Sequence, residues 1–168
     1  GSYDDREVEA TMVSVLSAKE REKLINQYGG FTSNVTCNYI EADYMVEAQL
    51  REIEPGSYDH IILLSSSILE DTQEADARTI VGKVLLEEIL QDQEHRPQIL
   101  IELANPDNSS LVGGNGAEMI VSPVIISHLL AQVALRRELQ SIYTQLFTVG
   151  GAEIEFRSPE RYGLSKGS

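Results

Sequence analysis

Short apolar runs alternate with amphipathic segments along most of this 168-residue chain. The clearest case is an apolar run at residues 60–64, a helix-forming segment at 77–91 and a second apolar run at 99–103. Strand, loop, helix and strand in this order form the βαβ unit of a parallel sheet. Because ligands bind beyond the carboxyl ends of such strands, we expect function near residues 65–67 and 105–108.

The same alternation continues through the rest of the chain. It predicts strands at residues 11–16, 35–40, 60–64, 99–103 and 119–121, and helices at residues 18–28, 46–53, 77–91 and 123–147. Strictly alternating elements favour a doubly wound α/β fold with a mostly parallel sheet. Residues 152–157 alternate like a short edge strand. We therefore divide the chain into an N-terminal extension with a tag scar (1–10), a main domain (11–148) and a tail (149–168).

The last predicted helix is long and apolar on more than one side. Ser122 is in position to cap it, and Pro123 suits its first turn. Its apolar residues exceed what one face can hold, so we expect it to pack on its own sheet and on a partner. A helix buried wholly within one domain is the other interpretation. The predicted homo-oligomer contact consists of Ile125, Ile126, Leu129 and Val133.

The formal net charge of -14 changes this picture. Between Cys37 and Ser110 there are sixteen Asp and Glu residues against four Lys and Arg. Such a field repels nucleic acid and anionic lipid and attracts cations or basic partners, unless it is only a solvated, solubilising surface. The sequence contains no signal-peptide pattern and no bilayer-spanning apolar run. A single cysteine excludes an internal disulfide and suits a reducing compartment.

Polar residues after two of the strands are candidates for a nucleotide site. Asp43 follows the second strand, and Ser65, Ser66 and Ser67 follow the third. A carboxylate at Asp43 can accept a hydrogen bond from an adenine amino group, or it can cap the next helix. Serines can bind a ligand through their hydroxyls, but they also form ordinary turns. Both interpretations stay open.

A second candidate site is the acidic loop made by Glu70, Asp71, Glu74 and Asp76. Calcium binds several oxygen ligands, and a carboxylate-rich loop can supply them. The spacing does not match an EF-hand. Asp71 followed by Glu74 also forms a capping box for the helix after it. A calcium site and a helix cap are therefore both expected candidates.

Several segments occur in an order and spacing that resemble one family. They are YDHIILL, ADART, the strand containing Glu102, MIVS, HLLAQVA and LFTVGGAEIEF. Together they resemble the regulatory domains of the CASTOR/POLLUX group of ion channels and their bacterial relatives, which are similar to the RCK (TrkA-N type) domains that regulate potassium conductance. The resemblance implies a Rossmann-like module that forms rings on the cytoplasmic face of a membrane pore and converts ligand binding into gating.

The chain departs from that family at its start. A complete module opens with a glycine-containing strand and turn, followed by a helix that meets the pyrophosphate of a dinucleotide. No segment matches this first β-α unit, and the glycines at 113–116 read as a turn. We therefore expect NAD to bind weakly or not at all.

The missing unit predicts a gap in the sheet. In the strand order 3-2-1-4-5-6 the first strand lies at the centre, here between residues 11–16 and 60–64. Unpaired buried backbone groups are costly, so we expect the gap to be closed. The two flanking strands can pair directly, residues 3–10 can replace the missing strand, or a second copy can lend one.

Three classes of function stay open. The resemblance favours a cytoplasmic, ligand-sensing gating-ring domain of a potassium or other cation channel. The alternatives are a structural assembly module without ligand and a fragment of an NAD-dependent oxidoreductase. The three histidines are more than thirty residues apart, and no metal-hydrolase or nucleophile-elbow motif occurs. We therefore predict that the chain is not an enzyme.

Overall fold

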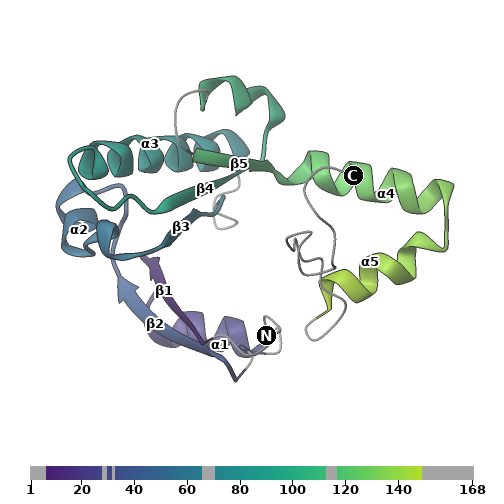
Figure 1. The fold of residues 1–168 in the computed structure, drawn as a ribbon, viewed down its shortest axis with the longest axis horizontal. Helices are drawn as coiled ribbons and strands as arrows, with labels where there is room; N and C mark the ends of the chain where they lie inside the picture. The colour runs from purple at the N-terminus through teal and green to yellow at the C-terminus, as the bar shows by residue number, and fades with distance from the viewer. Residues whose placement is uncertain (1–6, 28–29, 32, 66–70, 113–116, 149–168) are drawn as a thin grey trace, which may run out of the picture. The chain divides into compact units, whose positions relative to one another are not determined.

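The computed structural model describes residues 7–27, 30, 31, 33–65, 71–112 and 117–148. The chain divides into two compact units, Gly1–Leu129 and Leu130–Ser168. In the described part of the first unit, parallel strands alternate with helices (Figure 1), which confirms the predicted α/β class. The strands form two sheets, one of β1 and β2 and one in the order β3-β4-β5.

The elements follow the predicted order. They are β1 (Val8–Ser14), α1 (Ala18–Gln27), β2 (Val35–Glu41), α2 (Glu47–Glu52), a 3₁₀ helix (Pro55–Ser57), β3 (His60–Leu63), α3 (Thr72–Leu90), β4 (Gln98–Leu103), a second 3₁₀ helix (Pro106–Leu111), β5 (Ala117–Val121), α4 (Ser122–Leu135) and α5 (Leu139–Phe147).

Several predicted element bounds differ from the structure. β1 spans Val8–Ser14 rather than residues 11–16. α3 begins at Thr72 rather than residue 77, because Asp71 caps it earlier than the apolar pattern indicates. The single helix at 123–147 is two helices, α4 and α5. The predicted strand at 152–157 lies outside the described residues.

The break between α4 and α5 is a tight turn. The N–H of Leu139 donates to the carbonyl of Arg136 at 3.0 Å, and the N–H of Gln140 donates to that of Arg137 at 3.1 Å. These bonds to the third preceding residue replace the α-helical bonds to the fourth. The helical periodicity of apolar residues continues on both sides of the turn, so it did not reveal the break.

The main core lies between α3 and one face of the β3-β4-β5 sheet (Figure 1). Alternate residues of β4 point to α3, and Ile99, Ile101 and Leu103 are buried there while Leu100 and Glu102 lie on the other face. The buried core residues are Leu50, Leu63, Leu86, Leu90, Ile99, Ile101, Leu103 and Val112. Leu50 belongs to α2, so α2 is held against the same core.

The β1-β2 sheet is held to α1 by Arg21. This side chain is buried, and its guanidinium donates to the carbonyls of Met12 in β1 and Ile40 in β2. It also lies over the Tyr39 ring at 5.3 Å. The start of α1 is fixed by a capping box in which the N–H of Ser17 donates to the Glu20 carboxylate at 3.1 Å.

The predicted gap between the two sheets is not closed by direct pairing. β1 pairs with β2, β3 pairs with β4, and no described strand pairs with the other edge of either. Residues 8–10 also do not replace the missing strand, because they form the start of β1. Residues 3–6 lie outside the described part of the chain.

Candidate functional site

The candidate site is the carboxyl edge of the strands, where the chain leaves each sheet. Asp43 follows β2, Ser65 follows β3, Asn105 follows β4 and Ser122 follows β5. In parallel α/β sheets this edge is the usual place for ligands. The polar contacts found there are described strand by strand.

Glu102 joins the ends of three elements. Its Oε2 accepts a hydrogen bond of 3.1 Å from the N–H of Ser65, and its Oε1 accepts one from the hydroxyl of Ser122. Ser122 opens α4, so the carboxylate lies at a helix N-terminus, where negative charge is favoured. The Ser122 hydroxyl therefore contacts Glu102, and its predicted role as the cap of α4 stays a prediction. Glu102 was not predicted as a site residue, although a charged residue inside the run QILIEL was the available signal.

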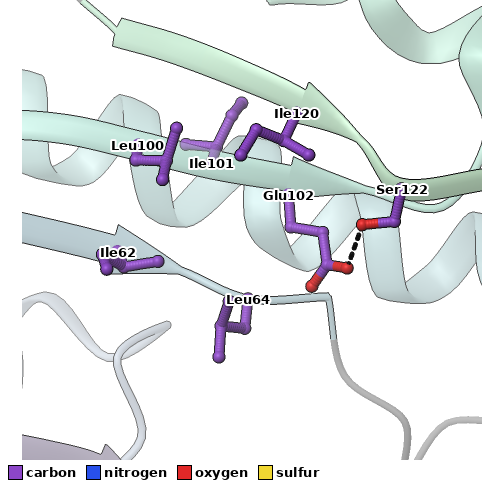
Figure 2. A pocket seen from close by; sticks show the side chains of 7 residues that line it. All are labelled: Ile62, Leu64, Leu100, Ile101, Glu102, Ile120 and Ser122. Atoms are coloured by element: carbon purple, nitrogen blue, oxygen red, sulfur yellow. Dashed lines mark hydrogen bonds between the residues drawn. The ribbon is translucent and has the colours of Figure 1, made fainter. Parts of the chain in front are cut away.

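A hollow of about 170 Å³ opens beside Glu102 (Figure 2). Its walls are mostly aliphatic, and they are formed by Ile62, Leu64, Leu100, Ile101, Glu102, Ile120 and Ser122. The arrangement therefore offers one carboxylate and one hydroxyl beside an apolar surface.

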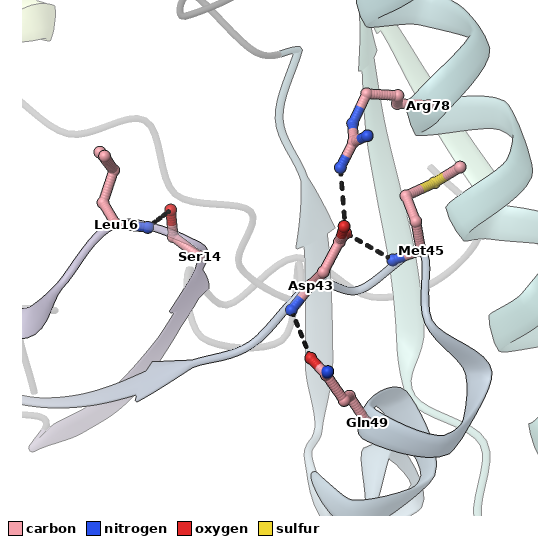
Figure 3. A network of polar contacts seen from close by, with 6 residues as sticks. All are labelled: Ser14, Leu16, Asp43, Met45, Gln49 and Arg78. Atoms are coloured by element: carbon pink, nitrogen blue, oxygen red, sulfur yellow. Dashed lines mark hydrogen bonds and ion pairs between the residues drawn. The ribbon is translucent and has the colours of Figure 1, made fainter.

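Asp43 is the centre of a second polar network (Figure 3). One carboxylate oxygen, Oδ1, accepts a hydrogen bond of 3.0 Å from the N–H of Met45 and pairs with Arg78 at 3.0 Å. The N–H of Asp43 donates to the side chain of Gln49 at 2.7 Å. Val46, not Asp43, is the residue that precedes α2, so Asp43 stabilises the turn before that helix rather than capping it.

Arg78 and Tyr44 place this network against α3. The guanidinium of Arg78 lies over the Tyr44 ring at 5.7 Å. A Cβ atom at Gly82 would come within 2.8 Å of the ring carbon Cε2 of Tyr44, so only glycine leaves room for this ring on α3. Through these contacts the end of β2 is connected to α3. Sequence reasoning missed Arg78, because its partner lies 35 residues away.

Asp76 fixes the loop that follows β4. Its side chain is fully buried and accepts three hydrogen bonds. The donors are the N–H of Ala104 at 2.7 Å, the N–H of Asn105 at 2.9 Å and the side-chain amide of Asn108 at 2.8 Å. Three donors satisfy the buried carboxylate, so its role in this structure is to position the loop.

The predicted calcium ligands are not brought together in the described structure. Asp71 caps α3 by accepting a 2.8 Å bond from the N–H of Gln73, Glu74 is exposed in the first turn, and Asp76 is buried with its own donors. Among the described residues, no three His, Cys, Asp or Glu side chains are placed to hold a metal ion. Glu70 lies outside the described residues, so calcium binding stays a prediction.

The predicted nucleotide site is described only in part. Asp43 and Ser65 are half-buried, whereas Ser66 and Ser67 lie outside the described residues. Asp43 and Ser65 are at the ends of β2 and β3, which belong to different sheets. Nucleotide binding by these residues also stays a prediction.

In the described part of the chain, the helices α4 and α5 carry exposed apolar side chains. No described residue of either helix is buried. The large exposed apolar residues are Ile125, Ile126, Leu130, Leu135, Ile142 and Phe147. Among the helices of the described residues, none has the length and apolar character needed to cross a membrane.

No family model matches the chain. "Probable ion channel SYM8" of Pisum sativum is 26% identical over 169 residues, covering 95% of this chain and 18% of the relative. "Ion channel POLLUX" of Lotus japonicus is 30% identical over 125 residues, covering 72% and 13%. The chain therefore spans less than a fifth of these curated relatives.

The fold has a counterpart among solved structures. The human SLO3 gating ring matches 92% of this chain and 27% of its own chain, with a TM-score of 0.61 and 15% identity. At this identity the likeness shows the fold alone. The curated relatives confirm the resemblance to the CASTOR/POLLUX group of ion channels.

Proposed function

With the resemblance to CASTOR/POLLUX-type regulatory domains as the premise, we propose that the chain is a cytoplasmic gating-ring domain of a potassium or other cation channel. It assembles with further copies and transmits ligand binding to a membrane pore elsewhere in the full-length protein. The observation that carries this proposal is that the curated relatives are ion channels and the matching solved fold is a channel gating ring.

Assembly follows from the unburied apolar surface of α4. Ile125 is 43% exposed and Ile126 is 54% exposed, while Leu129 and Val133 are half-buried. Contiguous apolar surface of this kind marks an interaction site, and a symmetric contact between identical copies is the simplest closed arrangement. The proposed contact consists of these four residues.

Sedimentation of the isolated chain tests the assembly. Leu129→Glu places a charge in the contact and should raise the monomer fraction. Ala131→Glu is the matched control, because it adds the same charge at an exposed position on the opposite side of α4 and should leave assembly unchanged. A wild-type chain that stays monomeric at high micromolar concentration, or equal dissociation by both variants, contradicts the proposed contact.

Ligand sensing is assigned to the carboxyl edge of the strands. Ser65 and Glu102 supply polar groups there, at the apolar hollow of Ile62 and Leu100. Asp43 supplies a further carboxylate at the end of β2. Calcium remains a candidate for the acidic loop and is tested by calorimetry on wild type and on the Asp71→Asn, Glu74→Gln double variant. Binding heat from wild type but not from the double variant supports the loop site. Equal heats from both proteins place the site elsewhere, and no heat from either protein rejects calcium binding.

An assembly module without ligand is the second candidate. It is favoured by the fact that Asp43 and Asp76 are already bound by donors of the chain itself. The two candidates differ in one measurement. The module without ligand is favoured if a panel of nucleotides and divalent cations gives no binding heat and no thermal shift with an assembled chain.

A further inference from the structure

Glu102 connects two segments that are distant in the sequence. Its Oε2 accepts a hydrogen bond from the N–H of Ser65, 37 residues away. Its Oε1 accepts one from the hydroxyl of Ser122, 20 residues away (Figure 2). Because each oxygen is bound by a different donor, the carboxylate keeps Ser65 and Ser122 in one arrangement. A displacement of either donor therefore changes the contact that the other donor makes.

The backbone that carries Glu102 is fixed in the core. Its neighbours Ile101 and Leu103 are fully buried, and β4 is paired with a strand on each side. Fully buried residues in a closely packed core have little room to shift. Glu102 is therefore a stationary point to which both donors are bound.

Both donors lie just beyond the paired part of their strands. The ladder between β3 and β4 ends at Leu63, and the ladder between β4 and β5 ends at Val121. Ser65 is two residues past the first of these ends, and Ser122 is one residue past the second. Glu102 thus extends the connection between the strands to the points where the chain leaves β3 and enters α4.

The helix α4 has little buried surface that would fix its start. No described residue of α4 is buried, and Ile125 and Ile126 near its start are exposed. Elements with little buried surface open locally at a low free energy. The boundary between the two compact units falls within α4, after Leu129, so this helix carries residues of both units. The contact of Ser122 with Glu102 therefore bears on a helix that both units share.

We propose that Glu102 is a positioning residue that couples the end of β3 to the start of α4. When its carboxylate holds both donors, the first turn of α4 is fixed. When one donor leaves, the other is released and the first turn opens more often. Along the sequence, Ser65 leads to the acidic loop and Ser122 leads to the proposed contact of α4. The coupling thus regulates assembly, and in this consequence it rests on the proposed function.

Amide hydrogen exchange on the 168-residue chain tests the coupling with Ser122→Ala. This change removes the donor on α4 and leaves Ser65 and Glu102 in place. Exchange of the Ser65 amide should become at least about 2-fold faster, the lower end for groups that share a partner. Ser127→Ala is the matched control, because the Ser127 hydroxyl donates to the Pro123 carbonyl at 2.7 Å within the same helix. The control should leave the exchange of the Ser65 amide unchanged.

Two changes of Glu102 separate the coupling from a general loss of structure. Glu102→Gln keeps both contacts, because the new side-chain oxygen can accept from Ser65 and the new amide can donate to the Ser122 hydroxyl. The amides of Ser65 and Ile126 should then exchange at nearly wild-type rates. Glu102→Leu removes both contacts and should speed exchange of both amides. Adding Ser122→Ala to Glu102→Leu should have no further effect on the Ser65 amide.

Sedimentation connects the coupling to assembly. Glu102→Leu should raise the dissociation constant of self-association by at least about 2-fold, whereas Glu102→Gln should leave it unchanged. An unchanged dissociation constant for Glu102→Leu, in a chain that assembles, overturns the regulation of assembly. A wild-type chain that stays monomeric rejects the proposed contact of α4, and the coupling between Ser65 and α4 is then decided by exchange alone.

Two exchange results overturn the coupling itself. Unchanged exchange of the Ser65 amide in Ser122→Ala means that Glu102 holds the two donors independently. Equal acceleration by Ser122→Ala and Ser127→Ala means that the Ser65 amide responds to any hydroxyl lost from α4. Both results come from serine variants, so the coupling is decided even if Glu102→Leu does not fold.

Discussion

Replacing Asp76 with alanine should be among the most damaging single changes in the described part of this protein. The carboxylate is fully buried and accepts bonds from Ala104, Asn105 and Asn108. Hydrogen bonds to a charged group contribute about 1.5–3 kcal/mol each, and losing the acceptor leaves buried donors without a partner. Because Ala104, Asn105 and Asn108 are only half-buried, water can reach part of the loop. The contributions of the three hydrogen bonds to stability therefore do not add fully.

We therefore expect a loss of roughly 3–5 kcal/mol in the free energy of unfolding, which is the range for breaking a buried polar network. For a chain of this length that corresponds to a decrease of about 10 °C in the melting temperature. Urea titration followed by far-ultraviolet circular dichroism measures the free energy, and a thermal scan measures the temperature.

Glu88→Ala is the matched control for Asp76→Ala. Glu88 is an exposed acid of the same helix, so its removal should change stability by no more than about 0.5 kcal/mol. A loss below about 1 kcal/mol for Asp76→Ala, or equal losses for both variants, refutes the view that this carboxylate holds the loop after β4.

Three further predictions concern the helices and the nucleotide. Gly82→Ala should gain roughly 1 kcal/mol of helix propensity but lose more stability because the new methyl group overlaps the Tyr44 ring. Denaturation should show a net loss of stability, and adding Tyr44→Leu should relieve it. Hydrogen bonds from Ser17 lower the pKa of Glu20 from its usual 4.5. The Glu20 carboxylate therefore stabilises the fold above pH 4.5, and this stabilisation is lost as the pH falls through the lowered pKa. Melting curves of wild type and Glu20→Gln should differ at neutral pH and converge in acid. NADH titrated into the chain should show weak binding or none, and saturable binding in the low micromolar range contradicts this.

The sequence by itself determined the order and type of most elements. Five strands alternate with helices as the apolar pattern predicted, and β2, α1 and β4 begin within one residue of the expected positions. These features depend on neighbouring residues, because periodicity, caps and glycine or proline breaks act within a few positions. The resemblance to channel regulatory domains was equally readable from motifs along the chain.

Tertiary structure alone decided which polar groups meet at the carboxyl edge. Glu102 contacts Ser65 across 37 positions and Asp43 contacts Arg78 across 35, distances at which no local pattern reports a contact. Asp76 looked like one of four loop carboxylates, but the packing of α3 on β4 buries it, so its oxygens accept bonds from the loop after β4 and not from solvent. The gap between β1 and β3 was predicted from the missing first unit, but only the fold shows that the two strands do not pair directly, because strand pairing is not set by neighbouring residues.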